Sequence, residues 1–449
     1  MEYNLKYFGT DGFRGVANEG LNVDHAFKIG RFVGWFYGLM QGKKARIVLG
    51  KDTRRSSYMF ESALVAGLVA SGADAYMLHV IPTPGVSYVT ADGAFDCGIM
   101  ITASHNPFTD NGIKLVNSNG EKMDDAVLAQ VEAYIDGKTE VPLATGDSIG
   151  QTVDFMQGRN RYIAHLISSA NFSLQGVKVG LDCANGAASS VAKPVFDALG
   201  ADVYVFNNTP NGFNINVNCG STHIDQLQSY VLRNNLDVGF AYDGDADRCL
   251  AVDERGHVVD GDLIMYVCGR YLNQHGGLAK STVVPTVMSN FGFFKALEEI
   301  GINHVDTAVG DKYVYAKMRE EGYSLGGEQS GHIIFGDIEN TGDGIMTSLR
   351  VMEAIRAQKE SLATLVRPVH LYPQQLDNVK VTDKNAAMND ESVRAAEKAA
   401  QEFLGDRGRC FMRASGTENL VRVLAEAPDA ELCRQANAYV LEALKPYLV

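Results

Sequence analysis

Three aspartates alternate along one short segment, Asp243, Asp245 and Asp247 in the run Asp-Gly-Asp-Ala-Asp-Arg. In an extended or looped backbone this spacing can direct all three carboxylates at one point, where they repel one another unless a cation lies between them. A hard divalent cation with oxygen ligands suits such a site. Arg248 follows directly and would suit a phosphate as the next ligand. The segment therefore predicts a metal site that adjoins a phosphate.

Two other interpretations of the acidic segment are an EF-hand and a solvated turn. In an EF-hand that starts at Asp243, Glu254 falls at position 12, but position 6 is Arg248, where the loop requires glycine. The flanking segments also have the composition of strands rather than helices. A solvated turn needs one or two aspartates, not three in register. The metal site is the better-supported interpretation.

A second segment, Thr102-Ala-Ser-His-Asn-Pro107, follows the apolar run 97–101. Its small and polar residues predict a loop at the end of a strand, where functional sites commonly lie. Ser104 is the candidate nucleophile and His105 is its neighbour. Adjacent side chains in an extended chain face apart, so the two do not form a hydrolase dyad, and there is no G-x-S-x-G elbow. On these residues alone an ordinary turn is an equally good interpretation.

Two further segments combine glycine with polar groups. In Gly326-Gly-Glu-Gln-Ser-Gly-His332 the glycines let a ligand approach the backbone, and the carboxylate of Glu328 can accept hydrogen bonds from neighbouring sugar hydroxyls. Arg413-Ala-Ser-Gly-Thr-Glu-Asn-Leu-Val-Arg422 offers hydroxyl and backbone N–H donors beside two arginines, which is typical of a phosphate cradle. Each pattern is weakly specific by itself, because glycine-rich hairpins and capped turns are common.

The composition of the 449-residue chain excludes several classes of protein. A net charge of −14 argues against a nucleic-acid-binding protein, which needs a basic stripe. The first residues lack the apolar segment of a secretion signal, and no span reaches the roughly 20 apolar residues of a transmembrane helix. The seven cysteines are scattered without a CxxC pair, which favours reduced thiols. We expect a cytoplasmic protein without a nucleic-acid or membrane partner.

The elements that must position these loops repeat one pattern three times. A short apolar run ends in polar residues, and a helix-length segment and a second apolar run follow. The first runs begin at Ala45, Val177 and Ser281. The helix-length segments are 57–70, 189–199 and 291–300, and the second runs are 73–78, 201–206 and 302–307. This repeat predicts three related α/β domains rather than one large sheet.

A different element order follows Pro373. We expect strands at 380–383, 409–413 and 420–426, and helices at 392–404 and 430–444, the last ended by Pro446. This order predicts a small α+β domain. Because prolines at 368 and 373 interrupt regular structure, residues 365–373 are a candidate hinge before it.

Taken together, five segments resemble the α-D-phosphohexomutases. They are Phe8-Gly-Thr-Asp-Gly-Phe-Arg-Gly15, Thr102–Pro107, Asp243–Arg248, Gly327–His332 and Arg413–Glu418. They occur in the family's order, so the resemblance covers nearly the whole chain. Gln329, the run Thr286–Asn290 and the run Gly310–Lys312 are most similar to the branch that acts on glucosamine phosphate. Asn419 departs from the family, which usually has proline there, but the change removes no hydrogen-bond donor.

The resemblance implies an α/β fold of four domains around a central cleft. Three similar α/β domains would span 1–155, 156–256 and 257–368, and a smaller C-terminal α+β domain would span 369–449. In this order they would carry a phosphoserine loop, a metal-binding loop, a sugar-binding loop and a phosphate-binding loop. A homodimer is left open.

The resemblance also implies a reaction, the interconversion of glucosamine 6-phosphate and glucosamine 1-phosphate through phosphorylated Ser104 and a 1,6-bisphosphate. Mg²⁺ would be held by Ser104, Asp243, Asp245 and Asp247. The phosphoryl oxygens would contact Arg14 and Arg248, and proton transfer would fall to Lys114, with His332 able to share it. The sugar would be held by Glu328 and Ser330, and the phosphate that is not transferred by Arg413, Ser415, Gly416, Thr417 and Arg422. Mannose or glucose phosphate as substrate, and a non-catalytic sugar-phosphate sensor, are the alternatives.

Overall fold

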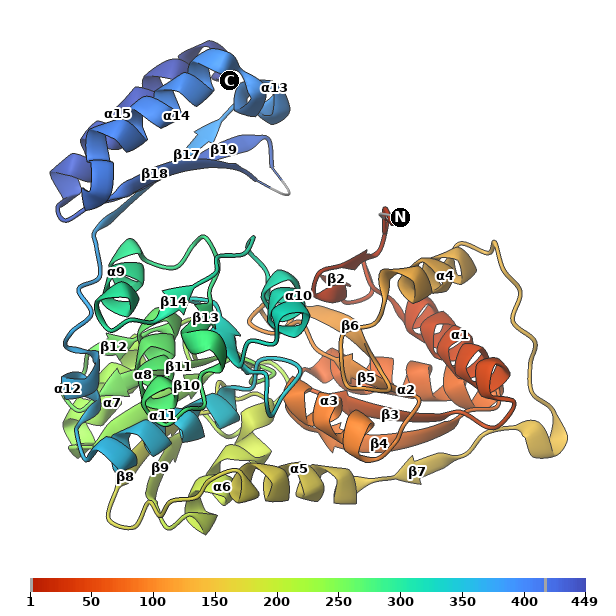
Figure 1. Ribbon diagram of the computed structural model, residues 1–449. Coiled ribbons are helices and arrows are strands. Elements are labelled where there is room, and N and C mark those ends of the chain that lie inside the picture. The colour runs from red at the N-terminus through yellow and green to blue at the C-terminus, as the bar shows by residue number, and fades with distance from the viewer. Residues whose placement is uncertain (1–2, 416–417) are drawn as a thin grey trace. The chain divides into compact units, whose positions relative to one another are not determined.

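The computed structural model describes residues 3–415 and 418–449, which form two compact units. The first unit comprises the chain up to residue 288 together with 302–366, and the second comprises 289–301 together with 367–449 (Figure 1). Within the described residues the strands form four sheets, three in the first unit and one in the second. The architecture is therefore mixed α/β with a small C-terminal sheet, as expected.

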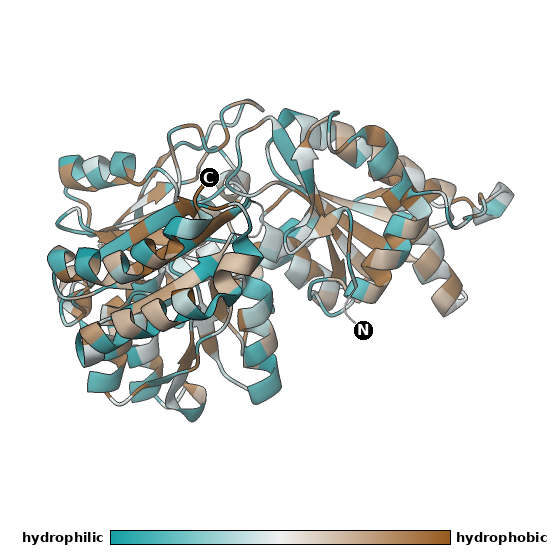
Figure 2. Ribbon diagram, turned by 90° about the horizontal axis from the view of Figure 1, so that it is seen from above, coloured by the Kyte–Doolittle hydropathy of each residue, from teal (hydrophilic) through white to brown (hydrophobic). Residues whose placement is uncertain are grey.

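The first sheet has seven strands in the order β1-β2-β6-β5-β3-β4-β7. The strands are β1 (Phe8–Gly9), β2 (Gly12–Val16), β3 (Arg46–Lys51), β4 (Asp74–Val80), β5 (Cys97–Ile101), β6 (Asp110–Asn117) and β7 (Thr152–Asp154). Its helices are α1 (Val23–Gln41), α2 (Arg55–Ala70), α3 (Thr83–Asp92) and α4 (Asp125–Ile135). Strands β5, β3, β4 and β7 run parallel. Every residue of β5 is buried, as expected of a strand covered on both faces, and Figure 2 shows such strands as largely hydrophobic.

The second and third sheets complete the first unit. The second has the order β12-β11-β10-β8-β9, and the third has the order β14-β13-β15-β16. The strands of the second are β8 (Lys178–Asp182), β9 (Asp202–Phe206), β10 (Val238–Tyr242), β11 (Cys249–Asp253) and β12 (Val258–Val259). Those of the third are β13 (Thr282–Val284), β14 (Asn303–His304), β15 (Leu325–Gly327) and β16 (Ile333–Phe335). The helices are α5 (Met156–Ser168), α6 (Ala192–Ala198), α7 (Asp225–Asn234), α8 (Gly261–Gln274), α10 (Asp311–Glu321), α11 (Gly344–Gln358) and α12 (Leu362–Val366).

The expected strand–helix–strand repeat is confirmed in all three sheets. Strands β3 and β4, β8 and β9, and β13 and β14 each pair in parallel. The intervening helices are α2, α6 and α9 (Phe291–Glu299). A parallel pair needs such a crossover, which usually contains a helix. Helix α9 groups with the second unit, although it joins two strands of the third sheet in sequence.

The C-terminal sheet has the order β17-β19-β18, all antiparallel, and α14 and α15 pack against it (Figure 1). Its elements are β17 (Gln374–Lys380), α13 (Lys384–Asn389), α14 (Glu391–Leu404), β18 (Arg409–Ala414), β19 (Leu420–Glu426) and α15 (Ala430–Leu444). The strand expected at 380–383 is wrong, because β17 ends at Lys380 and Asp383 caps α13 by accepting hydrogen bonds from two backbone N–H groups. The other expected strands and helices of this domain are confirmed.

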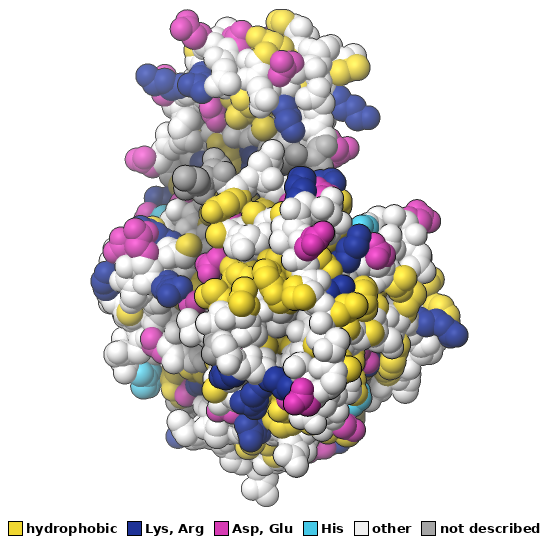
Figure 3. Space-filling view, turned by 90° about the vertical axis from the view of Figure 1, so that its right-hand side faces the viewer, with side chains coloured by type: hydrophobic (Ala, Val, Ile, Leu, Met, Phe, Trp, Pro, Cys, Tyr) yellow, Lys and Arg dark blue, Asp and Glu magenta, His cyan; other side chains and the backbone are white. Residues whose placement is uncertain are grey.

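The surface of the first unit is partly apolar. Figure 3 shows hydrophobic side chains between charged ones on one face of the molecule. A groove of about 670 Å³ is lined by Val65 and Val69 of α2 and by Leu143 and Ile149 of the segment that leads to β7. None of the helices within residues 3–415 and 418–449 has the length and hydropathy of a membrane-spanning segment. All seven cysteines lie in the described residues, and each is buried and free.

Candidate active site

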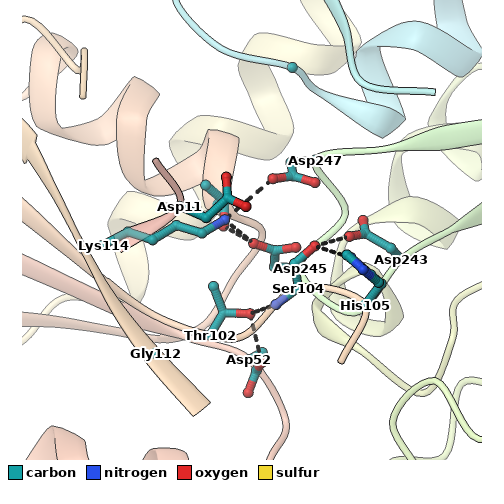
Figure 4. A network of polar contacts seen from close by, with 12 residues as sticks. Asp11, Asp52, Thr102, Ser104, His105, Gly112, Lys114, Asp243, Asp245 and Asp247 are labelled. Atoms are coloured by element: carbon teal, nitrogen blue, oxygen red, sulfur yellow. Dashed lines mark hydrogen bonds and ion pairs between the residues drawn. The ribbon is translucent and has the colours of Figure 1, made fainter. Parts of the chain in front are cut away.

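The phosphoserine candidate and the aspartates meet in the first unit, where the loops that follow β5 and β10 face each other (Figure 4). Ser104 is 1% exposed, and its Oγ donates a hydrogen bond to Asp243 Oδ2 at 2.6 Å. Its backbone φ of 50° lies in the left-handed region, which is uncommon for a residue other than glycine. A buried hydroxyl on a strained loop, aimed at a carboxylate, is a feature of functional sites rather than of ordinary turns.

The three aspartates form one cluster, as their spacing predicted. One carboxylate oxygen from each of Asp243, Asp245 and Asp247 lies within 4.8 Å of the others, and all three residues are buried. Burial, and then repulsion from the other two carboxylates, raises the pKa of Asp243 well above its usual range. Oδ1 of Asp245 and Oδ1 of Asp247 are buried without a hydrogen-bond partner. Unpartnered carboxylate oxygens at this density fit a bound divalent cation.

Lys114 projects from β6 into the same cluster. Its Nζ lies 2.8 Å from Asp245 Oδ2 and 3.3 Å from Asp247 Oδ2 (Figure 4). Burial by itself would lower the pKa of Lys114, but the two carboxylates outweigh burial and raise it. A general acid/base needs a pKa near the working pH, whereas the pKa of Lys114 is raised in this arrangement. The role itself stays a prediction.

Two arginines flank the loop that holds Ser104. Arg248 Nη1 lies 3.2 Å from His105 Nδ1, and the backbone N–H of Arg248 donates to Asp243 Oδ1. Arg14 Nη2 lies 3.4 Å from Asp11 Oδ2. Burial, then the charges of Arg248 and Arg14, lowers the pKa of His105. The neutral imidazole can therefore accept from Arg248, and each arginine keeps a buried Nε without a hydrogen-bond partner.

The segment after β15 reaches the aspartates through His332. Its Nδ1 lies 3.8 Å from Asp247 Oδ2, and its Nε2 lies 3.4 Å from Asp311 Oδ2. Burial would lower the pKa of His332, but Asp247 and Asp311 outweigh it and raise the pKa to about 9. Glu328 Oε1 accepts from the N–H of Gly310. Ser330 is exposed, so its hydroxyl is open to a ligand.

In the second unit the predicted phosphate cradle lies on two adjacent strands. Arg413 of β18 and Arg422 of β19 are directly opposite in the antiparallel register. Burial, and then the charge of Arg422, lowers the pKa of Arg413. Like charges directly opposite destabilise a sheet, so this pair suits an anion as its counter-charge. Ser415 is buried, whereas Gly416 and Thr417 lie outside the described residues.

The sequence analysis did not single out several residues that lie beside the phosphate cradle or beneath the Ser104 loop. Lys384 Nζ donates to the carbonyls of Ser415 and Glu418 and adds a cation beside the cradle. Asp52 and Arg54 are fully buried beneath the Ser104 loop. Their only signal in the sequence was a run of polar residues at the end of an apolar strand. That signal marks a strand end facing a site, but it does not say which residue the side chains contact.

A cavity of about 930 Å³ in the first unit opens beside Lys114 and the aspartate cluster. Lys114 and Asp247 line it, together with Asp11, Lys122 and Asp311. Lys122 Nζ lies 2.6 Å from Asp311 Oδ1, so an ion pair joins the loop after β6 to α10 at this cavity. The volume is within the usual range for small-molecule sites, about 300–1,000 Å³.

Solved structures with the same fold cover nearly the whole chain. A phosphoglucomutase/phosphomannomutase family protein from Burkholderia thailandensis matches with a TM-score of 0.79 at 23% identity, covering 98% of each chain. N-acetylphosphoglucosamine mutase from Aspergillus fumigatus, solved in complex with GlcNAc-6P and magnesium, matches with a TM-score of 0.67 at 18% identity. That match covers 99% of this chain and 96% of the fungal chain. At these identities the likeness concerns the fold.

Sequence comparison extends to all four expected domains. Models described as phosphoglucomutase/phosphomannomutase domains I, II and III and C-terminal domain match residues 5–142, 160–256, 260–372 and 376–443. Two phosphoglucosamine mutases, from Lachnoclostridium phytofermentans and Lachnospira eligens, are 57% and 58% identical, each over 98% of both chains. The four-domain organisation is thus confirmed, while the expected boundaries after residues 155, 256 and 368 remain predictions. The chain belongs to the phosphoglucomutase/phosphomannomutase family.

Proposed function

We propose that this protein is a phosphoglucosamine mutase that interconverts glucosamine 6-phosphate and glucosamine 1-phosphate through a phosphoserine at Ser104. The observation that carries the proposal is the buried Ser104 hydroxyl, 2.6 Å from a carboxylate of the aspartate cluster. The choice of glucosamine rests on the two bacterial relatives, which are named phosphoglucosamine mutase and match almost the full chain. As a mutase, the enzyme belongs to the isomerase class.

The proposed cofactor is Mg²⁺. Asp243, Asp245 and Asp247 would hold it with one oxygen each, and the phosphoryl group on Ser104 would add a further ligand. One buried oxygen of Asp245 and one of Asp247 accept no hydrogen bond, which supports this assignment, and magnesium is present in the fungal structure. When bound, the cation neutralises charge that develops during phosphoryl transfer, a reaction that needs little beyond charge and positioning.

The reaction consists of two transfers that use the same serine. First, O1 of glucosamine 6-phosphate attacks the phosphorus on Ser104, the bond to Oγ breaks, and the hydroxyl proton of O1 leaves. The product is a 1,6-bisphosphate. After the bisphosphate turns around, Ser104 Oγ attacks the phosphorus on O6, the bond between that phosphorus and O6 breaks, O6 takes up a proton, and Ser104 regains a phosphoryl group. The serine is thus restored, and glucosamine 1-phosphate is released.

Lys114 is the proposed group that takes the proton from the sugar hydroxyl and later returns it. It can accept a proton only after the charges of Asp245 and Asp247 are offset, because those carboxylates favour its ammonium form. His332 lies 3.8 Å from one of these carboxylates, Asp247, and can share this work. Arg14 and Arg248 would contact the transferred phosphoryl oxygens, since they flank the Ser104 loop and the Nε of each makes no hydrogen bond.

The remaining predicted residues would hold the rest of the substrate. Glu328 and Ser330 would bind sugar hydroxyls. The phosphate that is not transferred would bind the cradle formed by Arg413, Ser415, Gly416, Thr417 and Arg422. The opposed guanidinium groups of Arg413 and Arg422 support this role, because a phosphate relieves their repulsion. A cytoplasmic location is proposed as well, since all seven cysteines of the described chain are free thiols.

The specificity constant kcat/KM for the 6-phosphates of glucosamine, mannose and glucose tests the proposal. We expect glucosamine 6-phosphate to give the highest value by at least about tenfold, a discrimination of about 1.4 kcal/mol. Ser104→Ala protein prepared in parallel is the control for contaminating mutase. A higher value for mannose or glucose phosphate would contradict the glucosamine assignment, and no turnover of any of the three would contradict a mutase.

A further inference from the structure

The backbone of Ser104 is held in a conformation that the residue does not favour by itself. Its φ of 50° is left-handed, and such strain persists only where the surroundings over-determine it. The two peptide groups that flank a residue set its φ and ψ. The contacts of the Ser104 N–H and of the Ser104 carbonyl therefore decide where its hydroxyl points.

Both peptide groups are tied to the buried carboxylate of Asp52. The N–H of Ser104 donates to Thr102 Oγ1 at 3.0 Å, and Thr102 Oγ1 donates in turn to Asp52 Oδ2 at 2.8 Å (Figure 4). Arg54 Nε donates to the same Asp52 Oδ2 at 2.8 Å, and Arg54 Nη2 donates to the Ser104 carbonyl at 2.8 Å. These four hydrogen bonds close a ring that begins and ends at Ser104. Asp52 and Arg54 are both 0% exposed, so water cannot substitute for either.

Arg54 holds the rest of the loop with the same guanidinium group. Its Nη2 also donates to the carbonyl of Asn106 at 2.9 Å, and its Nη1 donates to the carbonyl of Pro107. Three carbonyls of one loop thus converge on one planar donor. A guanidinium presents five N–H donors in a fixed fork, which a lysine ammonium does not reproduce.

A second donor reaches the same carbonyl from the second sheet's side of the site. Asn216 lies in the loop between β9 and α7, and its Nδ2 donates to the Ser104 carbonyl at 2.9 Å and to the Asn106 carbonyl at 3.1 Å. Asn216 is 7% exposed and is itself left-handed, with φ of 59°. Hydrogen bonds from Arg54 and Asn216 therefore hold the Ser104 loop from two segments, both of which belong to the first compact unit.

We propose that Arg54 and Asn216 are positioning residues for phosphoryl transfer, because they fix the Ser104 carbonyl and so keep its hydroxyl aimed at the aspartate cluster. Neither side chain contacts the hydroxyl or the aspartates in any described contact, so each acts through the loop. The proposal rests on the proposed function for its kinetic consequence. A misplacement of about 1 Å at a reacting atom can reduce a rate about 10²-fold while leaving substrate contacts intact.

The sharpest variant is Asn216→Gly. Glycine adopts a φ of 59° without strain, so the substitution removes the amide but spares the backbone. Asn218→Gly is the matched control, since Asn218 lies in the same loop, is left-handed with φ of 52°, and is exposed. Arg54→Lys is the second variant. It retains a cation beside Asp52 but cannot serve three carbonyls together.

Each variant is first tested for folding by thermal melting. The measurements are then kcat and KM for the sugar phosphate, and hydrogen exchange of the peptide that spans 102–107 without substrate. We expect Asn216→Gly and Arg54→Lys to reduce kcat about tenfold to 10²-fold with KM within about twofold, and to speed exchange at 102–107. Asn218→Gly should match the wild type in all three quantities.

If Asn216→Gly folds but keeps kcat within about twofold of the wild type and unchanged exchange, the proposal is wrong. The same result in Arg54→Lys overturns the role of Arg54. If Arg54→Lys does not fold, Arg54→Gln provides a neutral donor at the same place and is judged by the same measurements. The exchange measurement needs no turnover. If the wild type is inactive on all sugar phosphates, the proposed function is wrong. The hydrogen-exchange measurement still decides whether Arg54 and Asn216 hold the Ser104 loop.

Discussion

Ser104 Oγ lies 2.6 Å from Asp243 Oδ2, although 139 positions separate the two residues in the chain. The contact joins the loop after β5 of the first sheet to the loop after β10 of the second. It places the only predicted nucleophile against the predicted metal ligands. Several consequences of this arrangement for function and stability can be measured.

Asp245→Asn should weaken activity and Mg²⁺ dependence together. The substitution removes one of three charges from a hard-cation site and also one partner of Lys114. We expect the Mg²⁺ concentration for half-maximal activity to rise at least about tenfold. Asp253→Asn is the control, because Asp253 is also buried but accepts hydrogen bonds within a turn after β11. Equal Mg²⁺ dependence in wild type and Asp245→Asn would show that the metal binds elsewhere.

Gly244→Ala should damage the site by crowding the Ser104 loop. A Cβ at position 244 would lie 2.5 Å from the Ser104 carbonyl oxygen and 2.8 Å from Ile215 Cδ1. The backbone atom cannot move away without shifting Ser104, so we expect about a 10²-fold loss in kcat and about 1–3 kcal/mol of destabilisation. Gly38→Ala in α1 is the control, since its Cβ would meet no atom closer than 3.4 Å. Normal turnover by folded Gly244→Ala protein would mean that Ser104 tolerates displacement.

Asp343→Asn should stabilise the protein more at pH 8 than at pH 5. Burial, and then the nearby Glu339, raises the pKa of Asp343 from 3.8 to about 7. Between those values the folded state holds a proton that the unfolded chain has lost, so this group's contribution to stability falls as pH rises. Asparagine removes that pH dependence and can still accept at the N-terminus of α11, where Asp343 Oδ1 accepts from Met346.

The measurement for Asp343→Asn is urea unfolding at both pH values. We expect the free energy of unfolding of the variant, relative to the wild type, to increase by about 1–3 kcal/mol from pH 5 to pH 8. The control is Asp429→Asn, the same substitution at the exposed N-cap of α15, which should show no such increase. If the difference in the free energy of unfolding stays constant or reverses with pH, Asp343 is ionised in the folded protein at both pH values.

The C-terminal unit is predicted to respond to substrate through its phosphate cradle. Residues 365–373 contain the expected hinge, and Arg413 and Arg422 offer two cations to the phosphate that is not transferred. Sugar phosphate should therefore slow hydrogen exchange at 365–373 and 409–415. Arg422→Ala should raise KM and diminish the protection, whereas Arg434→Ala on the exposed face of α15 should do neither. Identical exchange with and without saturating ligand would refute this response of the C-terminal unit to substrate.

Much of the fold could be predicted because local patterns determine it. Helix α14 was expected at 392–404 and spans Glu391–Leu404, since Val393, Ala400 and Leu404 bury one helical face behind the cap of Asp390. Strand β17 was misplaced because its sequence is polar, and its alternate residues are exposed. Such a strand can be identified only from its pairing with β19, which lies about forty positions later. The local sequence pattern does not reveal this pairing.

The candidate site likewise contains residues that the sequence predicts and residues that only the fold reveals. Ser104 and the three aspartates could be singled out because their types and spacing are chemically unusual within a few residues. The roles of Arg54 and Asn216 could not, because each depends on a contact with a loop 50 or more positions away. A buried arginine that donates to carbonyls has no spacing rule, and only the fold brings it to Ser104.

The central claim, that Ser104 carries the phosphoryl group between two positions of glucosamine phosphate, is tested most directly by following that group. Dephosphorylated protein is charged with glucosamine 1,6-bisphosphate labelled with ³²P on both phosphates, and peptide mass spectrometry locates the modification. Unlabelled glucosamine 6-phosphate is then added in a rapid-quench experiment. We predict one labelled phosphoryl group on Ser104 that leaves the protein within a single turnover, and no labelling of Ser104→Ala. Label on another residue, label that stays on Ser104 while product forms, or an active Ser104→Ala protein would contradict the claim.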